Sequence, residues 1–348
     1  MGQCRSVIAG KSVAQGKVPI VSIVLPIFNG GATLAAALTS VAHQAAHVQG
    51  IELIGVDNGS TDGSPDLARR WQWPTGVRAK LIEERTPGVA AARNTGLRAA
   101  EGEFIAFLDQ DDEWPRGYLL AHLTVLRHGG FDLSFAHLVV KDSAGVCPSS
   151  VPERPKERLL HLRDNPFVPS QVIVSRHALN AVGLFDESLS GSDDWDLFVR
   201  IAFEPAVAMS NVGANTYALY HDHSGAQHRD IVRVALAERG VLNKHLHRLS
   251  PPAKRSAIAA ALQRSVRAMI AYGVVGDLSA VYGVWQPFVR EHLTAGEWMR
   301  WRGAFMVGAL VPPALFWWAV RLKRSAQRRT SSAVCGGYSG QRSRSPRF

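Results

Sequence analysis

Residues 103–114, EFIAFLDQDDEW, place a dense group of acids directly behind an apolar run. The apolar part predicts a buried strand, and the carboxylates of Asp109, Asp111 and Asp112 follow it within four positions. Like charges at this spacing repel one another, and their burial is costly unless a positive group compensates. The stretch therefore raises the hypothesis of a divalent cation bound at the end of a strand.

Four apolar runs of strand length alternate with segments of helical pattern in the first third of the chain. Continuous apolar strands separated by helices predict an α/β fold with a mostly parallel sheet covered by helices on both faces. We expect the first run to stop at Pro26, and Ser64 to cap the helix after the second run. The runs are residues 20–25, 51–57, 77–84 and 103–109.

Polar side chains follow three of these runs: Asn29, Asp57 and Asp109. In an open α/β sheet, ligands bind outside the carboxyl ends of the strands. We therefore expect these three residues to converge at one edge of the sheet, although they are far apart in the sequence.

The composition sets limits on the class of protein. A hydrophobic content of 46% and a charged content of 20% are ordinary for a globular protein. The formal net charge is +10, but residues 321–348 contain eight Lys or Arg and no acid, so residues 1–320 carry only +2. A basic tail of this kind does not indicate a nucleic-acid partner for the folded part.

The three cysteines form no CxxC motif, which fits a reducing compartment and argues against a zinc ribbon. No apolar segment typical of a signal peptide follows the first basic residues.

Several motifs have both a functional and a structural interpretation. FLDQDDEW contains a D-x-D that suits Mg²⁺ or Mn²⁺, but it would also suit an acidic turn before a helix. VDNGSTDGS (56–64) offers groups for a nucleoside, but its composition also favours an Asx-turn. AARNTG (91–96) places Arg93 on an apolar helix, where it would bind a phosphate or a base, or lie on the surface.

Two further motifs lie later in the chain. GSDDWDLFVR (191–200) supplies a second acid pair, Asp193 and Asp194, for proton transfer or for a favourable helix N-terminus. HDHSGAQH (221–228) has three histidines but no second cluster that would complete a structural zinc site. We interpret one of these histidines as a neighbour of the metal or of a leaving diphosphate.

The order of the motifs is more specific than any one of them. PIFNGG, VDNGSTDGS, AARNTGL, GEFIAFLDQDD, VGLFDESL, SDDWDLFVRI and Y-x-x-H follow one another over about residues 19–227. This series resembles the family 2 inverting glycosyltransferases of GT-A fold. The resemblance implies transfer of a sugar from a nucleotide-sugar donor with inversion, usually with Mg²⁺ or Mn²⁺ as cofactor.

The resemblance also implies roles for single residues. Asp194 occupies the position of the family's catalytic base, with Asp193 as the alternative. Asp111 occupies the position of the acid that binds the metal directly. The remaining matches are nucleotide contacts from Pro26, Phe28, Asp57, Asn58, Arg93 and Asp109, and metal contacts from Asp109 and His223.

The chain departs from the family pattern at three points. The family often has two Asp where this chain has Asp57 and Asn58, and a Glu-Asp pair where it has Asp193 and Asp194. In this family a Q-x-x-R-W motif after the second acid pair marks the processive polymer synthases. This chain has no such motif there, so we expect a single addition rather than processive synthesis. The expected partners are a UDP-sugar donor and a glycan or lipid-linked acceptor.

Residues 303–320 contain no charge and would form a helix of about 27 Å, close to the thickness of about 30 Å of a hydrocarbon core. Pro312 and Pro313 interrupt this segment. It is interpreted as a buried hairpin, a spanning or re-entrant anchor, or an interfacial helix. The two membrane interpretations together are favoured, which predicts a location at the cytoplasmic face of a membrane.

The predicted domain organisation has five parts: a flexible N-terminus (1–17), a GT-A catalytic domain (18–228), a mainly helical extension (229–302), the apolar segment (303–320) and a basic tail (321–348).

Two other functions are alternatives to a glycosyltransferase. A nucleotidyltransferase would carry a basic Gly-rich loop after the first strand, and PIFNGGATL contains no basic residue. A non-catalytic basic binder of membrane surfaces would leave both acid pairs unexplained.

Overall fold

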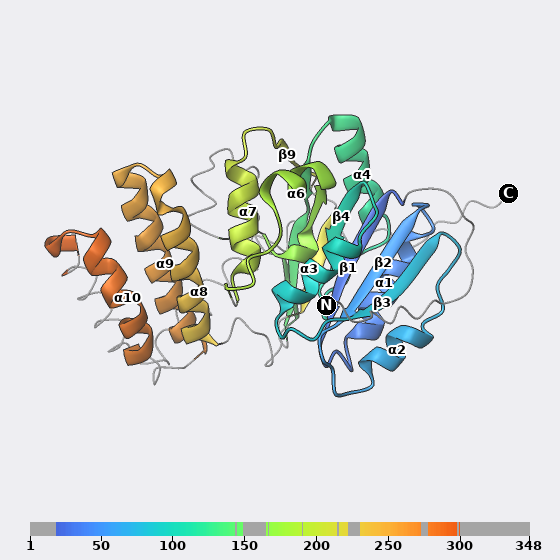
Figure 1. Cartoon of the computed structure of the whole chain (residues 1–348), viewed down its shortest axis with the longest axis horizontal. Helices are drawn as coiled ribbons and strands as arrows, with labels where there is room; N and C mark the ends of the chain where they lie inside the picture. Colours follow the sequence, from blue (N-terminus) through green and yellow to red (C-terminus); the bar gives the residue numbers. More distant parts are fainter. Residues whose placement is uncertain are drawn as a thin grey trace, which may run out of the picture. The chain divides into compact units, whose positions relative to one another are not determined.

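The computed structural model describes residues 19–142, 145–148, 165, 167–189, 191–213, 216–221, 230–272, 278–297 and 299. The chain divides into two compact units, Met1–Ala261 and Leu262–Phe348. Figure 1 shows the succession of elements along the chain by colour. The predicted boundary between residues 228 and 229 stays a prediction.

Seven strands of the first unit form one sheet in the order β3-β2-β1-β4-β8-β5-β9. Strand β8 runs antiparallel to its neighbours β4 and β5, and the other pairs run parallel. This arrangement confirms the predicted α/β fold with a mostly parallel sheet. The strands are β1 (Val21–Ile27), β2 (Ile51–Asp57), β3 (Val77–Glu83), β4 (Phe104–Phe107), β5 (Leu133–Phe135), β8 (Val172–Ser175) and β9 (Met209–Asn211).

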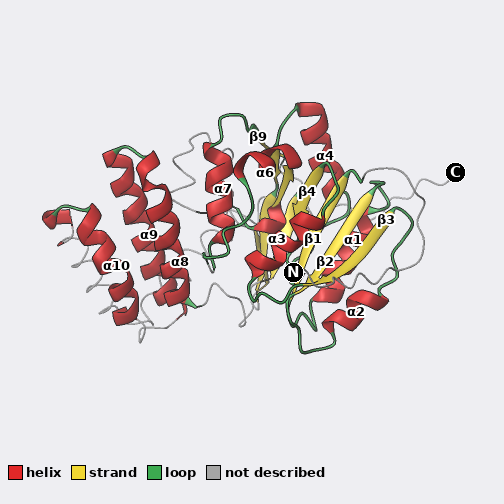
Figure 2. Cartoon of the chain, in the orientation of Figure 1, coloured by secondary structure: helices red, strands yellow, loops and turns green. Residues whose placement is uncertain are grey.

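Helices cover both faces of this sheet (Figure 2). Alternate residues of β1 serve the two sides: Ile23 and Leu25 belong to one core cluster and Val24 to the other. The first cluster includes side chains of α1 (Leu34–Gln44), α2 (Ser64–Arg70) and α4 (Tyr118–Gly129). The second includes side chains of α3 (Val89–Ala99), α6 (Arg176–Val182) and α7 (Asp193–Phe203).

A second, three-stranded sheet has the order β10-β6-β7, made of β10 (Tyr217–His221), β6 (His137–Asp142) and β7 (Gly145–Pro148). Residues 145–148 fall in the segment 141–169, whose Pro- and Ser-rich composition predicted a loop. That prediction is wrong for β7, because its backbone pairs antiparallel with β6 and is satisfied as a hairpin. The backbones of Glu113 and Leu219 bond to each other, so β10 lies beside the acidic stretch after β4.

Two local predictions are wrong. Strand β1 continues through Pro26 to Ile27. Its pairing with β4 ends at Val24 while its pairing with β2 continues to Ile27, so the missing N–H of proline falls where only one neighbouring strand remains. Ser64 does not cap α2 but begins it, after Gly63, and its Oγ accepts the backbone N–H of Gly31 at 3.0 Å.

Helices follow the strands in sequence, as predicted: α8 (Ile231–His245), α9 (Pro251–Tyr272) and α10 (Leu278–His292). In the part of the chain that the structure describes, no helix is both long and apolar enough to cross a membrane. The apolar segment 303–320 lies outside the described residues, and so does the basic tail.

The contact of α3 with β1 depends on Gly96. A Cβ atom built at Gly96 would approach Val24 more closely than real Cβ atoms approach any heavy atom. We predict that Gly96→Ala lowers the free energy of unfolding by about 1–3 kcal/mol, because the overpacking outweighs the helix propensity that Ala adds. Urea unfolding would measure this loss.

Gly283→Ala is the matched control, because a Cβ at Gly283, also within a helix, would meet nothing within 4 Å. Equal effects of the two substitutions would show that the packing of α3 on β1 does not require glycine.

Candidate functional site

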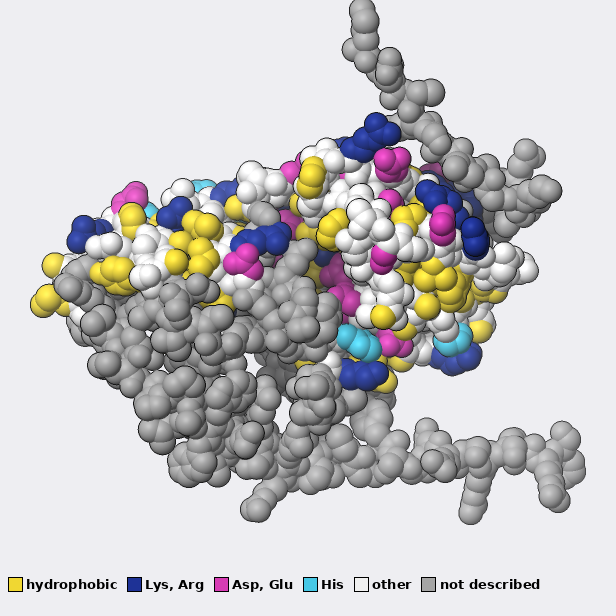
Figure 3. All heavy atoms as spheres, turned by 90° about the horizontal axis from the view of Figure 1, so that it is seen from below, with side chains coloured by type: hydrophobic (Ala, Val, Ile, Leu, Met, Phe, Trp, Pro, Cys, Tyr) yellow, Lys and Arg dark blue, Asp and Glu magenta, His cyan; other side chains and the backbone are white. Residues whose placement is uncertain are grey.

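The carboxyl ends of β2, β1 and β4 lie side by side because these strands are neighbours in the sheet. They place Asn29, Asp57 and Asp109 along one edge, as the sequence predicted for the ends of these strands, and Asn29 Oδ1 accepts the Thr61 N–H at 2.8 Å. Figure 3 shows acidic and histidine side chains gathered on one face of the molecule.

The centre of this edge is an ion-pair bridge formed by Arg93 of α3. Its Nη2 donates to Asp109 Oδ1 at 2.7 Å and its Nη1 to Asp193 Oδ2 at 3.0 Å. The Arg93 side chain is 6% exposed, that of Asp109 23% and that of Asp193 4%. The bridge joins the D-x-D to the second acid pair, 84 positions later in the chain.

Burial and charge oppose each other in this bridge. Burial disfavours the charge of Arg93, but Asp109 and Asp193 more than offset it and raise the pKa of the guanidinium above its usual value. Burial also raises the pKa of Asp193, although the charge of Arg93 counteracts the shift. The guanidinium also lies over the Phe185 ring, 5.5 Å from its centroid. Arg93 Nε has no hydrogen-bond partner among the described residues.

Asp194 has a different environment from Asp193. It is half-buried, and no ion pair of Asp194 is found among the described residues. Its Oδ1 accepts the N–H of Trp195 at 2.7 Å and its Oδ2 accepts from Asn165 at 3.2 Å. Burial, followed by the charge of Asp193, raises the pKa of Asp194 to about 7. A carboxylate with this pKa is suited to accept a proton near neutral pH.

The acidic loop after β4 is held by Ser170, in the short 3-10 helix Pro169–Gln171. Ser170 Oγ accepts the Asp109 N–H at 3.1 Å and bonds to Asp112, and its carbonyl accepts from Trp114 Nε1 at 2.7 Å. Asp112 is fully buried. Burial, followed by the charges of Asp109 and Asp111, raises the pKa of Asp112 well above its usual value. Asp112 is therefore a structural acid of the loop.

Gln110, between the two acids of the D-x-D, connects this loop to the end of β1. Its Oε1 accepts the Phe28 N–H at 2.9 Å, and its Nε2 donates to the Phe28 carbonyl at 2.8 Å. A Cβ at Gly30 would lie 2.5 Å from Gln110 Oε1, so a larger residue there would displace the Gln110 side chain from this contact. The backbone of Phe28 is thus fixed by Gln110, while its ring is 56% exposed.

The loop after β2 is also closely tied. Asp57 Oδ1 accepts the Ser60 N–H at 3.1 Å, which is the Asx-turn expected from the composition, and its Oδ2 has no partner among the described residues. The Asn58 amide donates to the carbonyls of Glu84 and Thr86 at 2.9 and 2.8 Å and accepts the Gly88 N–H. Most of the hydrogen-bonding capacity of Asn58 therefore holds loops together, and its contact with a nucleoside stays a prediction.

The predicted metal ligands are only partly described. Asp111 is half-buried in the acidic loop, and His223 lies outside the described residues. His221 Nε2 lies 2.9 Å from Glu113 Oε1, so His221 reaches this loop. No group of three or more His, Cys, Asp or Glu arranged to hold a metal is found among the residues with a described position. Asp109 and Asp111 nevertheless fit Mg²⁺ or Mn²⁺, since such ions bind one or two carboxylates together with water and phosphate oxygens.

Two of the residues that organise this edge have no clear signal in the sequence. Gln110 and Ser170 are single uncharged residues, and their partners are 82 and 61 positions away. Only their position could have pointed to them: Gln110 lies inside the D-x-D, and Ser170 follows a proline just before a strand.

The sequence is similar to proteins of known family. Residues 22–166 match the model of the family described as glycosyl transferase family 2. The glycosyltransferase AglE of Haloferax volcanii is 33% identical over 115 residues, which are 33% of this chain and 38% of that protein. The chain spans less than half of the first curated relatives that it matches, between 26% and 47% of their length.

Two solved structures share the fold. TarS 1–349 of S. aureus, in complex with UDP-GlcNAc, has 18% identity and a TM-score of 0.56 over 83% of this chain and 81% of that one. The mannosyltransferase PcManGT of Pyrobaculum calidifontis, in complex with GDP-Man and Mn²⁺, has 21% identity and a TM-score of 0.54 over 84% and 86%. At these identities the likeness shows the GT-A fold alone, as the sequence predicted.

The bridge makes a prediction about stability. Arg93→Met removes the cation and leaves the buried carboxylate of Asp193 unpaired, so we expect a loss of about 3–5 kcal/mol in the free energy of unfolding at pH 8. Without Arg93 the folded-state pKa of Asp193 rises further above its unfolded value. The folded state then binds more protons, so the loss grows as the pH rises and is smaller at pH 5.

Urea unfolding at both pH values would measure this difference. Arg69→Met is the control, because Arg69 pairs with Asp66 on the surface and should change stability by about 0.5 kcal/mol or less. A loss that is independent of pH would show that Arg93 stabilises the protein by packing rather than by charge.

Proposed function

We propose that the protein is a glycosyltransferase that moves one sugar from a nucleoside-diphosphate donor to an acceptor hydroxyl with inversion. The observation that carries this proposal is the bridge from Asp109 through Arg93 to Asp193. It brings both acid pairs to the edge of the sheet at which α/β proteins bind their ligands. The match of residues 22–166 to the glycosyl transferase family 2 model supports the same activity.

The donor's nucleoside is proposed to lie at the ends of β1 and β2. Asp57 offers a carboxylate oxygen without a partner among the described residues, and the exposed ring of Phe28 offers an apolar surface. Pro26 and Asn58 complete the proposed contacts. Arg93, whose Nε is unpaired, would add a donor for the nucleotide.

A divalent cation, Mg²⁺ or Mn²⁺, is proposed to be held by Asp109 and Asp111, with His223 nearby. When bound, it would offset the charge that develops on the leaving diphosphate. Asp109 keeps one oxygen on Arg93, so the protein's own cation already balances part of the negative charge at this position.

Asp194 is the proposed base that takes the proton of the acceptor hydroxyl. Two observations favour it over Asp193. Asp193 is bound to Arg93, whereas no ion pair of Asp194 is found among the described residues. The pKa of Asp194 is also raised to about 7, which is closer to the pH at which a general base works best.

We further propose UDP-sugar as the donor and a surface glycan or lipid-linked saccharide as the acceptor, at the cytoplasmic face of a membrane. TarS was solved with UDP-GlcNAc, which supports a uridine donor, while PcManGT was solved with GDP-Man, so both nucleotides belong in the test. The motifs before the D-x-D contain no basic loop of the kind expected for a nucleotidyltransferase.

The metal and donor proposal is tested by calorimetric titration with UDP- and GDP-sugars, with and without Mn²⁺. We expect binding of one donor that depends on Mn²⁺ and is lost in Asp111→Ala, because the variant lacks a carboxylate for the ion. Asp66→Ala removes an exposed acid on α2 and should bind like the wild type. Binding that is unchanged in Asp111→Ala would remove this residue from the metal site.

The base is tested by Asp194→Asn. We expect transfer to fall by at least about 10²-fold while donor binding persists, since only proton removal is lost. In the wild type, kcat/KM should rise with pH along an acidic limb near pH 7, because Asp194 must be deprotonated to act. Near-normal transfer by Asp194→Asn would assign the proton to another group.

A further inference from the structure

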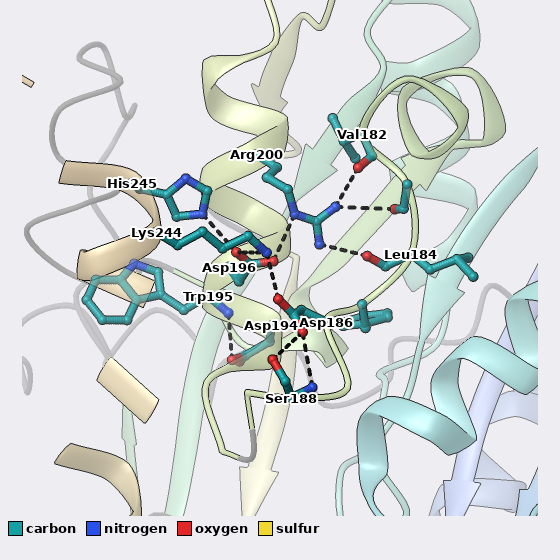
Figure 4. Close-up of polar contacts among 12 residues, drawn as sticks. Val182, Leu184, Asp186, Ser188, Asp194, Trp195, Asp196, Arg200, Lys244 and His245 are labelled. Atoms are coloured by element: carbon teal, nitrogen blue, oxygen red, sulfur yellow. Dashed lines mark hydrogen bonds and ion pairs between the residues drawn. The ribbon is translucent and has the colours of Figure 1, made fainter. Parts of the chain in front are cut away.

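Helix α7 carries a third acid in its first turn, Asp196, which the proposed chemistry does not use. Asp196 is fully buried, and its carboxylate points toward Lys244 and His245 of α8 (Figure 4). Its Oδ1 lies 2.8 Å from His245 Nε2 and 2.9 Å from Lys244 Nζ, and its Oδ2 accepts from Arg200 Nε at 2.8 Å. Both oxygens of this carboxylate are therefore held by cationic or polar groups from two helices.

The charges of this network balance. Lys244 also pairs with Asp186 at 2.8 Å, so two carboxylates face two cations. Burial opposes the charge of Asp196, but the hydrogen bond from His245 and the charge of Arg200 hold its pKa well below the usual range. An ionised carboxylate only accepts, so His245 Nε2 must carry the proton and donate. His245 Nδ1 has no partner among the described residues.

The same network also holds the segment before α7. Arg200 donates to the carbonyls of Val182 and Leu184 at 2.6 and 2.7 Å. Asn94 of α3, next to Arg93, accepts the N–H of Phe185 at 2.9 Å and donates to its carbonyl at 3.0 Å. The start of α7 is thus fixed by α3 through Arg93 and by α8 through residues 244 and 245, while Asn94 fixes the segment before it.

Asp194 lies between these two anchors. Asp193 is tied to Arg93 and Asp196 to α8, so the orientation of the one helical turn that carries Asp194 is set by its two neighbouring acids. We propose that Asp196, Lys244 and His245 are positioning residues, and that α8 thereby orients Asp194 toward the acceptor. This inference rests on the proposed function, and it makes α8 part of the catalytic apparatus rather than an appendage.

The central experiment compares His245→Leu with His245→Gln. Leu removes the donor to Asp196, whereas the Gln side chain places an N–H donor close to the position of His Nε2. We expect kcat to fall by about 10-fold or more in His245→Leu, because a small displacement of a catalytic group lowers the rate strongly. We expect His245→Gln to restore kcat to within about 3-fold of the wild type. The KM and Kd for the donor should stay unchanged in both, since none of the proposed donor contacts lies on α8.

Two measurements separate positioning from general loss of structure. The stoichiometry of donor binding counts the folded sites, so an unchanged stoichiometry with lowered kcat supports the inference. Lys244→Met serves as a second variant, because Lys244 is 39% exposed and its loss is easier for the fold to tolerate. It should also lower kcat without changing the donor KM. His247→Leu, which changes an exposed histidine two positions later, is the matched control and should behave like the wild type.

The possible outcomes are distinct. If the wild type transfers sugar and His245→Leu has the same kcat, the positioning role is contradicted. A fall in kcat that matches a fall in binding stoichiometry, or that His245→Gln does not reverse, also contradicts it. If the wild type neither binds nor transfers any donor, the proposed function fails instead, whatever the variants do.

Discussion

The ion-pair bridge from Asp109 through Arg93 to Asp193 is the interaction on which the site depends. A buried arginine needs carboxylates, and two buried or half-buried carboxylates need a cation, so neither side is stable here without the other. The bridge crosses from the end of β4 to the start of α7 and passes through α3. Because its three members come from three elements, it also fixes the distance between the two acid pairs that the proposed chemistry assigns to donor and acceptor.

The first turn of α7 shows how environment separates the roles of similar side chains. Asp193 is paired with Arg93, Asp196 is paired with three groups of α7 and α8, and Asp194 is left half-buried with a raised pKa. All three lie near the positive end of the helix dipole, so the dipole does not distinguish them. The neighbouring elements do, and they leave one acid of the three available for proton transfer.

The sheet and much of its edge could be predicted from the sequence because the signals are local. The apolar runs at residues 20–25 and 51–57 have strand length, and polar residues lie at or just beyond their carboxyl ends. The acid pair at residues 193 and 194 likewise gave a local signal for the N-terminus of α7. Contacts across long separations had no such signal: Arg93 was expected to bind a phosphate or a base, or to lie on the surface, and nothing in its surroundings indicated a pair with Asp193. Gln110 and Ser170 act through hydrogen bonds to residues distant in the sequence, and no local pattern marks the contacts of Asp196 with α8.

The most direct test of the account is to map where Mn²⁺ lies in the presence of UDP, through its broadening of backbone amide signals in NMR spectra. We expect selective broadening at the ends of β1, β2 and β4 and at the first turn of α7, at residues 28–30, 57–60, 109–112 and 193–195, and only when both Mn²⁺ and UDP or GDP are present. Broadening centred on another part of the chain, or equal broadening without nucleotide, would contradict the claim that the Arg93 bridge marks the donor site.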